Sequence, residues 1–145
     1  MPNTDRAATI LLVEDDPGDE LMAREAFEDD ALSSDLHVAR DGQEALDFLY
    51  RRGRHASAPR PDFILLDLNL PRVDGRQVLR QVKSDAAVAS IPVVVLTTSS
   101  ADEDVVACYG AHSNAYITKP SGYDEFVDVV RQINQFWMDT ARLPS

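Results

Sequence analysis

Short apolar runs alternate with longer amphipathic stretches along most of the chain. The apolar runs fall at residues 9–14, 36–39, 63–67, 93–96 and 115–118. This alternation is typical of repeated βα units around a parallel sheet. We therefore predict an α/β fold with five strands and helices on both faces of the sheet.

Local signals indicate where two of the helices begin. Asp16 stands before Pro17, the pattern of an N-cap followed by proline at the first helical position. Asp41 and Glu44 have the spacing of a capping box. Each signal comes just after a predicted strand, as a βα unit requires.

The remaining helices are predicted from apolar spacing. The helix that begins at Asp41 is expected to end near Gly53, and the next one to end before Pro92, which cannot continue a helix. A fourth helix is expected over 102–109 and a fifth over 123–140. The apolar stripe of the fifth is expected to contain Phe126, Val129, Val130, Ile133, Phe136 and Trp137.

Length and composition indicate one globular domain, expected over residues 8–140 with a leader at 1–7 and a tail at 141–145. The chain has 145 residues, 44% of them hydrophobic. No apolar run approaches the roughly 18 residues of a membrane span, and the first residues lack the pattern of a signal peptide. We expect a cytoplasmic protein without a membrane segment. A single cysteine, Cys108, excludes an internal disulfide.

The net charge of −11 argues against binding to nucleic-acid phosphates. Four arginines do gather at Arg51, Arg52, Arg54 and Arg60, but small residues and proline interrupt them. We interpret this stretch as a solvated loop, with docking to a partner as the alternative.

Polar residues follow four of the predicted strands at their carboxyl ends. Glu14, Asp15 and Asp16 close the first run, and Asp67 ends the third. Thr97 and Thr98 follow the fourth run, and Lys119 follows the fifth. In open α/β sheets the carboxyl ends of the strands form the ligand site, so these side chains can meet. A buried carboxylate such as Asp67 needs partners, and acids converging with a lysine suggest a divalent cation and an anionic reaction.

These motifs resemble the receiver domains of two-component response regulators, the CheY-like family. The resemblance covers about residues 8 to 140 and is carried by LLVEDD at 11–16, DLNLPRVDG at 67–75, LTTS at 96–99 and YITKP at 116–120. It implies a flavodoxin-like (βα)5 fold with strand order 2-1-3-4-5. It also implies a signalling protein that catalyses only its own phosphorylation and slow dephosphorylation.

The resemblance assigns roles to the strand-end residues. Asp67 corresponds to the phosphoacceptor, which attacks phosphorus to give an acyl phosphate. Asp15 corresponds to the metal-binding acid, and Glu14 would reach the ion directly or through water. Asp67 and the backbone carbonyl of Asn69 complete the metal site, and oxygen ligands of this kind suit Mg²⁺. Lys119 would contact the phosphoryl oxygens and pair with Asp67 at rest. The Lys119–Pro120 peptide would be cis.

The resemblance also implies a switch. Thr97 corresponds to the hydroxyl that binds a phosphoryl oxygen, and Tyr116 to the aromatic side chain that turns inward after it. Phosphorylation would then shift the population between two packings of the fourth strand, fourth helix and fifth strand. This shift would switch the surface formed by the fourth helix, fifth strand and fifth helix, which would signal to a partner. Ordinary packing at the sheet edge is the alternative for Tyr116.

Three further residues near these motifs are interpreted from their positions. Asp16 is interpreted as a helix cap rather than a metal ligand. Thr98 stands where the family generally has a small residue, so it could restrict access to the site. His112 lies before the fifth strand, at the end opposite Lys119, and is interpreted as a surface or packing residue.

A narrower resemblance points to small single-domain response regulators that partner phytochromes and related sensor histidine kinases. It is carried by ALDFLYRRG at 45–53, residues 58–76 and the Phe136–Trp137 pair. Members of that group often form homodimers through the fourth helix, fifth strand and fifth helix. Phe136 and Trp137 could anchor such a surface or complete the core.

Three other functions fit the sequence less well. A scaffold that signals without phosphorylation would not need Glu14, Asp15, Asp67, Thr97 and Lys119 together. A hydrolase with an aspartyl-phosphate intermediate usually has an acid two residues after the nucleophile, and that position is Asn69. A DNA-binding regulator would need an output domain for which the chain is too short.

Overall fold

The computed structural model of the protein describes residues 8–28 and 34–143. Its strands are β1 (Ala8–Val13), β2 (Ser34–Ala39), β3 (Phe63–Leu66), β4 (Val93–Thr97) and β5 (Ala115–Thr118). They form one parallel sheet in the order β2-β1-β3-β4-β5. The predicted fold and strand order are confirmed, and each strand begins and ends within two residues of its predicted limits.

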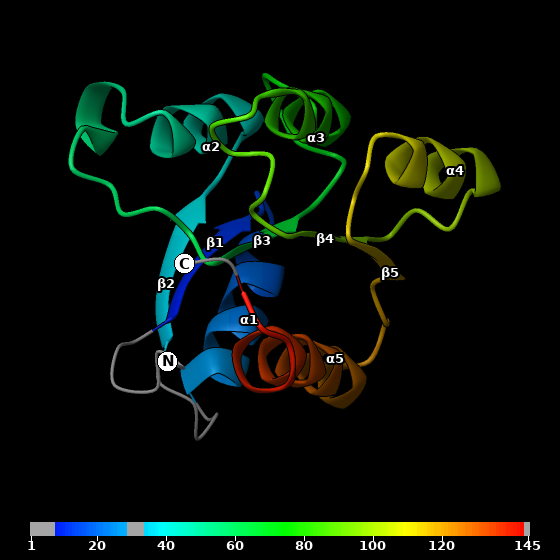
Figure 1. Cartoon of the computed structure of the whole chain (residues 1–145). Helices are drawn as coiled ribbons and strands as arrows, with labels where there is room; N and C mark the ends of the chain where they lie inside the picture. Colours follow the sequence, from blue (N-terminus) through cyan, green and yellow to red (C-terminus); the bar gives the residue numbers. More distant parts are fainter. Residues whose placement is uncertain (1–7, 29–33, 144–145) are drawn as a thin grey trace.

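Helices cover both faces of this sheet. They are α1 (Pro17–Glu28), α2 (Gly42–Leu49), α3 (Gly75–Ser84), α4 (Asp102–Gly110) and α5 (Tyr123–Gln135), with a short 3-10 turn, η1, at Gly53–His55. Figure 1 shows α2, α3 and α4 on one face and α1 and α5 on the other. None of the helices within 8–28 and 34–143 has the length and apolar character that crossing a membrane requires.

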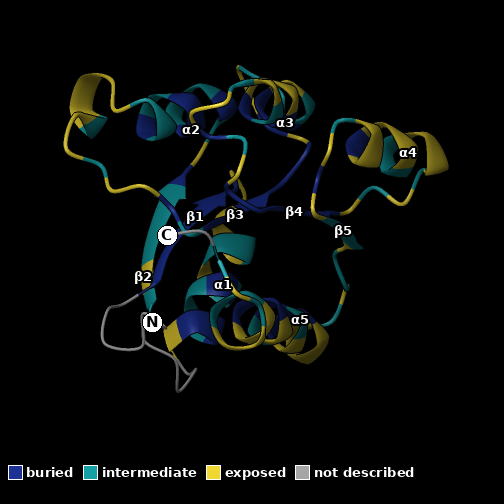
Figure 2. Cartoon of the chain, viewed as in Figure 1, coloured by how far each residue is buried: buried dark blue, intermediate teal, exposed yellow. Residues whose placement is uncertain are grey.

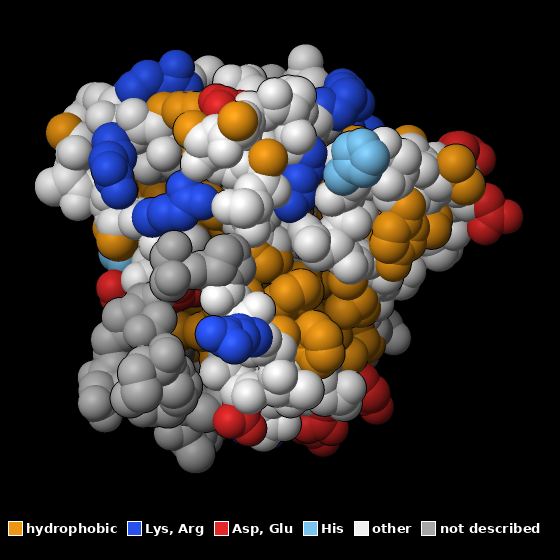
Figure 3. Space-filling model, in the orientation of Figure 1, with side chains coloured by type: hydrophobic (Ala, Val, Ile, Leu, Met, Phe, Trp, Pro, Cys, Tyr) orange, Lys and Arg blue, Asp and Glu red, His pale blue; other side chains and the backbone are white. Residues whose placement is uncertain are grey.

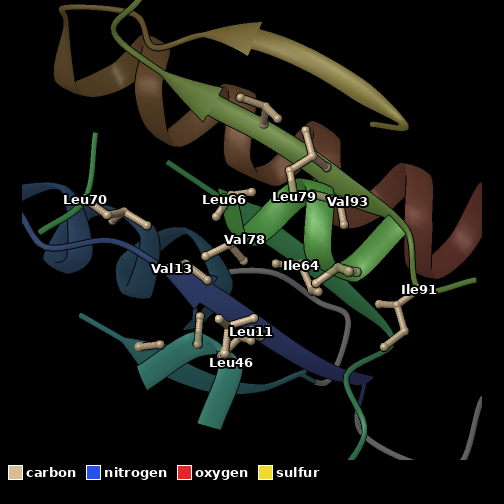
Figure 4. Close-up of a cluster of buried hydrophobic side chains, with 14 of the residues drawn as sticks. Leu11, Val13, Leu46, Ile64, Leu66, Leu70, Val78, Leu79, Ile91 and Val93 are labelled. Carbon is tan, nitrogen blue, oxygen red and sulfur yellow. The ribbon is translucent and has the colours of Figure 1, made fainter. Parts of the chain in front are cut away.

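The central strands are buried on both faces, which explains their continuous apolar runs (Figure 2). Alternate residues of β1 belong to different clusters. Leu11 and Val13 pack toward α2 and α3, as Figure 4 shows, whereas Ile10 and Leu12 pack toward α1 and α5. The sheet is therefore fixed from both sides, and its carboxyl edge is a rigid base for the polar residues that follow.

The two predicted helix starts are confirmed. The Asp16 carboxylate accepts a hydrogen bond from the Gly18 amide at 3.1 Å, and the Asp41 carboxylate accepts one from the Glu44 amide at 2.7 Å. The Glu44 carboxylate accepts from the Arg40 amide at 2.8 Å, one residue before the cap.

The end of the fifth helix differs from the prediction. Regular helix stops at Gln135, and Phe136–Thr140 forms a π-helical turn, η2. Phe136 is 50% exposed, so its assignment to the buried stripe was wrong, whereas Trp137 is partly buried against the α1–α5 core. At 3.6 residues per turn, Phe136 lies about 80° around the helix axis from Phe126, so it leaves the side of the helix that is buried.

Other features lie at the margins of the sheet. Arg51, Arg52 and Arg54 are exposed in the connection from α2 to β3, as expected of a solvated loop. At the opposite side, β5 is the edge strand and lies beside α4. There the Tyr116 backbone amide donates a hydrogen bond to the Tyr109 hydroxyl at 3.2 Å.

Candidate functional site

Three carboxylates converge at the carboxyl ends of β1 and β3. Glu14 and Asp67 are buried, while Asp15 is exposed. Backbone bonds fix the two buried acids, because the Glu14 amide donates to the Ala39 carbonyl and the Asp67 amide to the Val13 carbonyl. One carboxylate oxygen from each of the three acids lies within 4.8 Å of the other two.

This donor set fits a hard divalent cation. Carboxylate oxygens suit Mg²⁺ or Mn²⁺, and the exposed Asp15 leaves one side of the cluster open to water and substrate. Asn69 is exposed next to the cluster, and its amide donates to Asp67 Oδ1 at 3.3 Å. Its carbonyl as a metal ligand remains a prediction.

Lys119 provides the positive charge at this edge, and its side chain is only 5% exposed. Its Nζ lies 3.1 Å from Asp67 Oδ2, which confirms the expected ion pair, and 2.6 Å from Glu14 Oε1. A third carboxylate, Asp19 Oδ2, lies at 2.7 Å. The three donors of the ammonium group therefore face three carboxylates.

Asp19 was not predicted from the sequence. It lies in the first turn of α1, where an acid is ordinarily explained by the helix dipole. The signal that could have identified it is position, because the first turn after β1 lies above the carboxyl edge of the sheet.

Burial has the largest single effect on the pKa values of Glu14 and Lys119. Desolvation raises the pKa of Glu14 to about 7, although its hydrogen bond to Lys119 opposes the shift. Burial also lowers the pKa of Lys119, but the hydrogen bonds to Asp19 and Glu14 outweigh it, and the net shift is upward. Lys119 is thus always charged near neutral pH, while Glu14 exchanges a proton there.

Thr97 ends β4 and is fully buried. Its carbonyl accepts from the Lys119 amide at 2.7 Å, so the ends of β4 and β5 are joined directly at the site. The Thr97 hydroxyl oxygen accepts a long bond, 3.5 Å, from the Ser99 amide. The next residue, Thr98, is exposed.

Tyr116 lies in the inward position. Its hydroxyl donates to the Ser99 carbonyl at 2.8 Å, and its ring packs against the core cluster that contains Leu66 and Val95. The ring therefore packs against the core and also contacts the loop after β4, so both interpretations of this residue describe part of its surroundings.

The structure agrees with the predictions for Asp16 and His112 and contradicts one for Pro120. Asp16 caps α1 and is exposed, as predicted. His112 is exposed with a φ of 71° in the turn after α4, in agreement with a surface role. The cis peptide expected before Pro120 was wrong, since none of the peptide bonds in the described residues is cis. A proline peptide favours trans by only about 0.5–1 kcal/mol, so either isomer is accessible to this sequence.

Comparisons with known proteins agree with this geometry. The family model described as "Response regulator receiver domain" matches residues 10–131. Response regulator Rcp1 of Synechocystis sp. is 43% identical over 136 residues, which cover 94% of this chain and 92% of Rcp1.

Two solved structures are similar over nearly their whole length. The phosphorylated cyanobacterial phytochrome response regulator RcpA has a TM-score of 0.94 at 44% identity, covering 97% of this chain and 100% of RcpA. The Mn²⁺-bound form of Rcp1 has a TM-score of 0.92 at 42% identity, covering 95% and 99%. With its sheet order and its acidic cluster, this chain belongs to the family of response regulator receiver domains.

Proposed function

We propose that the chain is a stand-alone two-component response regulator, with its receiver domain at 8–140, that accepts a phosphoryl group from a sensor histidine kinase on Asp67. The proposal rests on the surroundings of the Asp67 carboxylate. It is buried at a strand end, grouped with Glu14 and Asp15, and paired with Lys119 at 3.1 Å.

The reaction is a transfer between a nitrogen and an oxygen. An Asp67 oxygen attacks the phosphorus of a phosphohistidine, a P–O bond forms, the P–N bond breaks, and the imidazole nitrogen leaves with the bonding pair. The Lys119 ammonium lies within reach of the oxygens that gain charge.

Mg²⁺ would be held by Glu14, Asp15, Asp67 and the Asn69 carbonyl. When bound, it reduces the repulsion between these acids and the incoming phosphoryl group. Glu14 must release its proton for this purpose, which its pKa of about 7 permits at the pH of a cell's cytoplasm, where we infer that the protein works.

Thr97 and Tyr116 would read the phosphorylated state. The Thr97 hydroxyl oxygen accepts the bond from the Ser99 amide, so the hydroxyl proton is not used in that bond. The proton could then be donated to a phosphoryl oxygen. The inward Tyr116 contacts the same Ser99. A change at Thr97 would therefore reach the α4–β5–α5 surface.

The relatives support a proposal for the partner kinase. RcpA is a phytochrome response regulator, which supports a phytochrome-type sensor kinase for this chain. A homodimer through α4, β5 and α5 is supported by four exposed large hydrophobic side chains on these elements and η2: Val106, Tyr109, Tyr123 and Phe136. Figure 3 shows hydrophobic side chains gathered between β5 and α5.

The test is intact-mass measurement after incubation with acetyl phosphate and Mg²⁺. We expect wild type to gain the mass of one phosphoryl group and Asp67→Asn to gain none. Asp16→Asn removes an acid from the same loop but outside the cluster, and it should label like wild type. Equal labelling of wild type and Asp67→Asn would overturn the assignment.

Size-exclusion chromatography of the same samples tests the dimer. The dimer should weaken when Phe136 or Val106 is replaced by serine. A wild-type monomer in both phosphorylation states would remove the dimer from the proposal.

A further inference from the structure

An ion pair joins the first turns of α3 and α4. The Arg76 guanidinium donates to both carboxylate oxygens of Asp104, from Nε at 3.1 Å and from Nη2 at 3.0 Å. The Arg76 side chain is 30% exposed and that of Asp104 is 19% exposed. Two parallel bonds in a partly desolvated place define the geometry far better than a solvated surface pair would.

Arg76 is fixed relative to the phosphoacceptor. The preceding residue, Gly75, donates its amide to the Leu68 carbonyl at 2.9 Å, and a Cβ on it would lie 2.1 Å from the Asp67 carbonyl oxygen. Asp74 then caps α3 and also contacts the Arg76 guanidinium at 3.2 Å. The backbone just before Arg76 therefore packs directly against the backbone of Asp67.

Asp104 continues the connection into the loop after β4. Its Oδ2 accepts a hydrogen bond from the Ser99 hydroxyl at 2.6 Å. The amide of Ser99 donates to the Thr97 hydroxyl oxygen, and its carbonyl accepts from Tyr116. One side chain, Asp104, thus holds the residue that both proposed switch residues contact.

Few other contacts hold this part of the chain. Ala101, the N-cap of α4, makes no side-chain capping bond, and Cys108 is the one buried residue in α4, which lies wholly within the described ranges. Alanine is a poor N-cap. The position of the β4–α4 loop therefore depends strongly on the polar bonds of Asp104.

We propose that Arg76 and Asp104 are positioning residues for phosphoryl recognition, because their ion pair holds the β4–α4 loop in the arrangement that presents the Thr97 hydroxyl to the phosphorylated Asp67. The inference rests on the proposed function and adds a connection from the phosphoacceptor loop to α4 that runs through α3. Hydrogen bonds from Arg76 and Ser99 lower the pKa of Asp104, so the pair is charged at neutral pH.

The experiment separates the metal site from the loop. Mg²⁺ affinity and the affinity for beryllium fluoride, which mimics a phosphoryl group on a carboxylate, are both measured by calorimetry on the full chain. Asp104→Ala and Arg76→Ala should each leave Mg²⁺ affinity unchanged, because neither residue belongs to the acidic cluster. Each should weaken beryllium fluoride binding about tenfold, as expected for one charged hydrogen-bonded pair.

The double variant tests whether the two residues act together. Arg76→Ala with Asp104→Ala should lose little more affinity than either single variant, since each change breaks the same bridge. Arg76→Lys keeps the charge without the paired geometry and should rescue only part of the affinity. Glu103→Gln is the matched control, an exposed acid in the same helical turn, and it should bind like wild type.

The outcomes distinguish this inference from the proposed function. A wild-type protein that binds neither Mg²⁺ nor beryllium fluoride would overturn both. Wild-type binding of both, with unchanged or tighter beryllium fluoride binding in Asp104→Ala, would overturn the positioning role alone. Unchanged Mg²⁺ affinity in each variant also shows that the variant is folded.

Discussion

α3 and α4 follow neighbouring strands of the site and have similar lengths, 10 and 9 residues, but they are held in different ways. α3 buries Val78, Leu79 and Val82 in the core and begins with a complete capping box. α4 buries Cys108 alone, and Val106 on its surface is 71% exposed. α3 is therefore anchored by packing, whereas α4 depends on a few polar bonds.

The difference assigns the two sides of the site to different tasks. The end of β3 that leads into α3 carries Asp67, which as the proposed phosphoacceptor would have to keep its geometry. The end of β4 that leads into α4 carries Thr97, which in the proposed switch would respond to the phosphoryl group. A helix with few buried contacts can change position at a small cost in free energy, so the weakly packed side suits the proposed response.

The largest effect that tests this comparison is on stability. Leu79→Ala should lower the free energy of unfolding by about 2–5 kcal/mol, because it leaves a cavity in the α3 core. Val106→Ala, on the exposed surface of α4, should change it by less than about 0.5 kcal/mol. Urea unfolding followed by circular dichroism measures both, and equal losses would contradict the assignment of α3 and α4.

A second effect is expected in amide hydrogen exchange. Central amides of α4 should exchange about a hundredfold faster than those of α3, because α4 can open without disturbing the core. Mg²⁺ with beryllium fluoride should slow exchange in α4, while Mg²⁺ alone should not. Slower exchange in α4 with Mg²⁺ alone would show that the metal, and not the phosphoryl group, orders this helix.

The smallest of the three effects concerns pH on the fixed side of the site. In the proposed site Mg²⁺ would compete with the proton on Glu14, whose pKa burial raises to about 7, so Mg²⁺ affinity should increase about tenfold from pH 6 to pH 8. Calorimetry at several pH values measures this slope. Glu14→Gln should flatten it, and Val106→Ala should not; a slope that survives in Glu14→Gln would assign the proton to another group.

Much of the fold could be predicted because the pattern of apolar and polar residues along the chain indicates which segments are buried. The central strands have apolar side chains on both faces, and Asp16 and Asp41 mark helix starts through bonds to amides two or three residues away. Polar residues at strand ends could be grouped because a parallel sheet brings those ends together.

What could not be predicted depends on side-chain contacts between distant elements. Asp19 is an ordinary first-turn acid until Lys119 is found 2.7 Å away, 100 residues later in the chain. Arg76 and Asp104 are likewise common surface residue types, and only the relative position of α3 and α4 pairs them. Phe136 was misassigned because it was included for its apolar character, although the α-helical spacing from Phe126 places it off the buried side.

The bond between the Tyr116 amide and the Tyr109 hydroxyl bears on how copies of the chain can associate. Edge strands invite another chain to extend the sheet through main-chain hydrogen bonds. Here a side chain from α4 already occupies an outward amide of a strand only 4 residues long. Association along this edge is therefore restricted to side-chain contacts, which can separate again, and continuous growth of the sheet into aggregates is disfavoured.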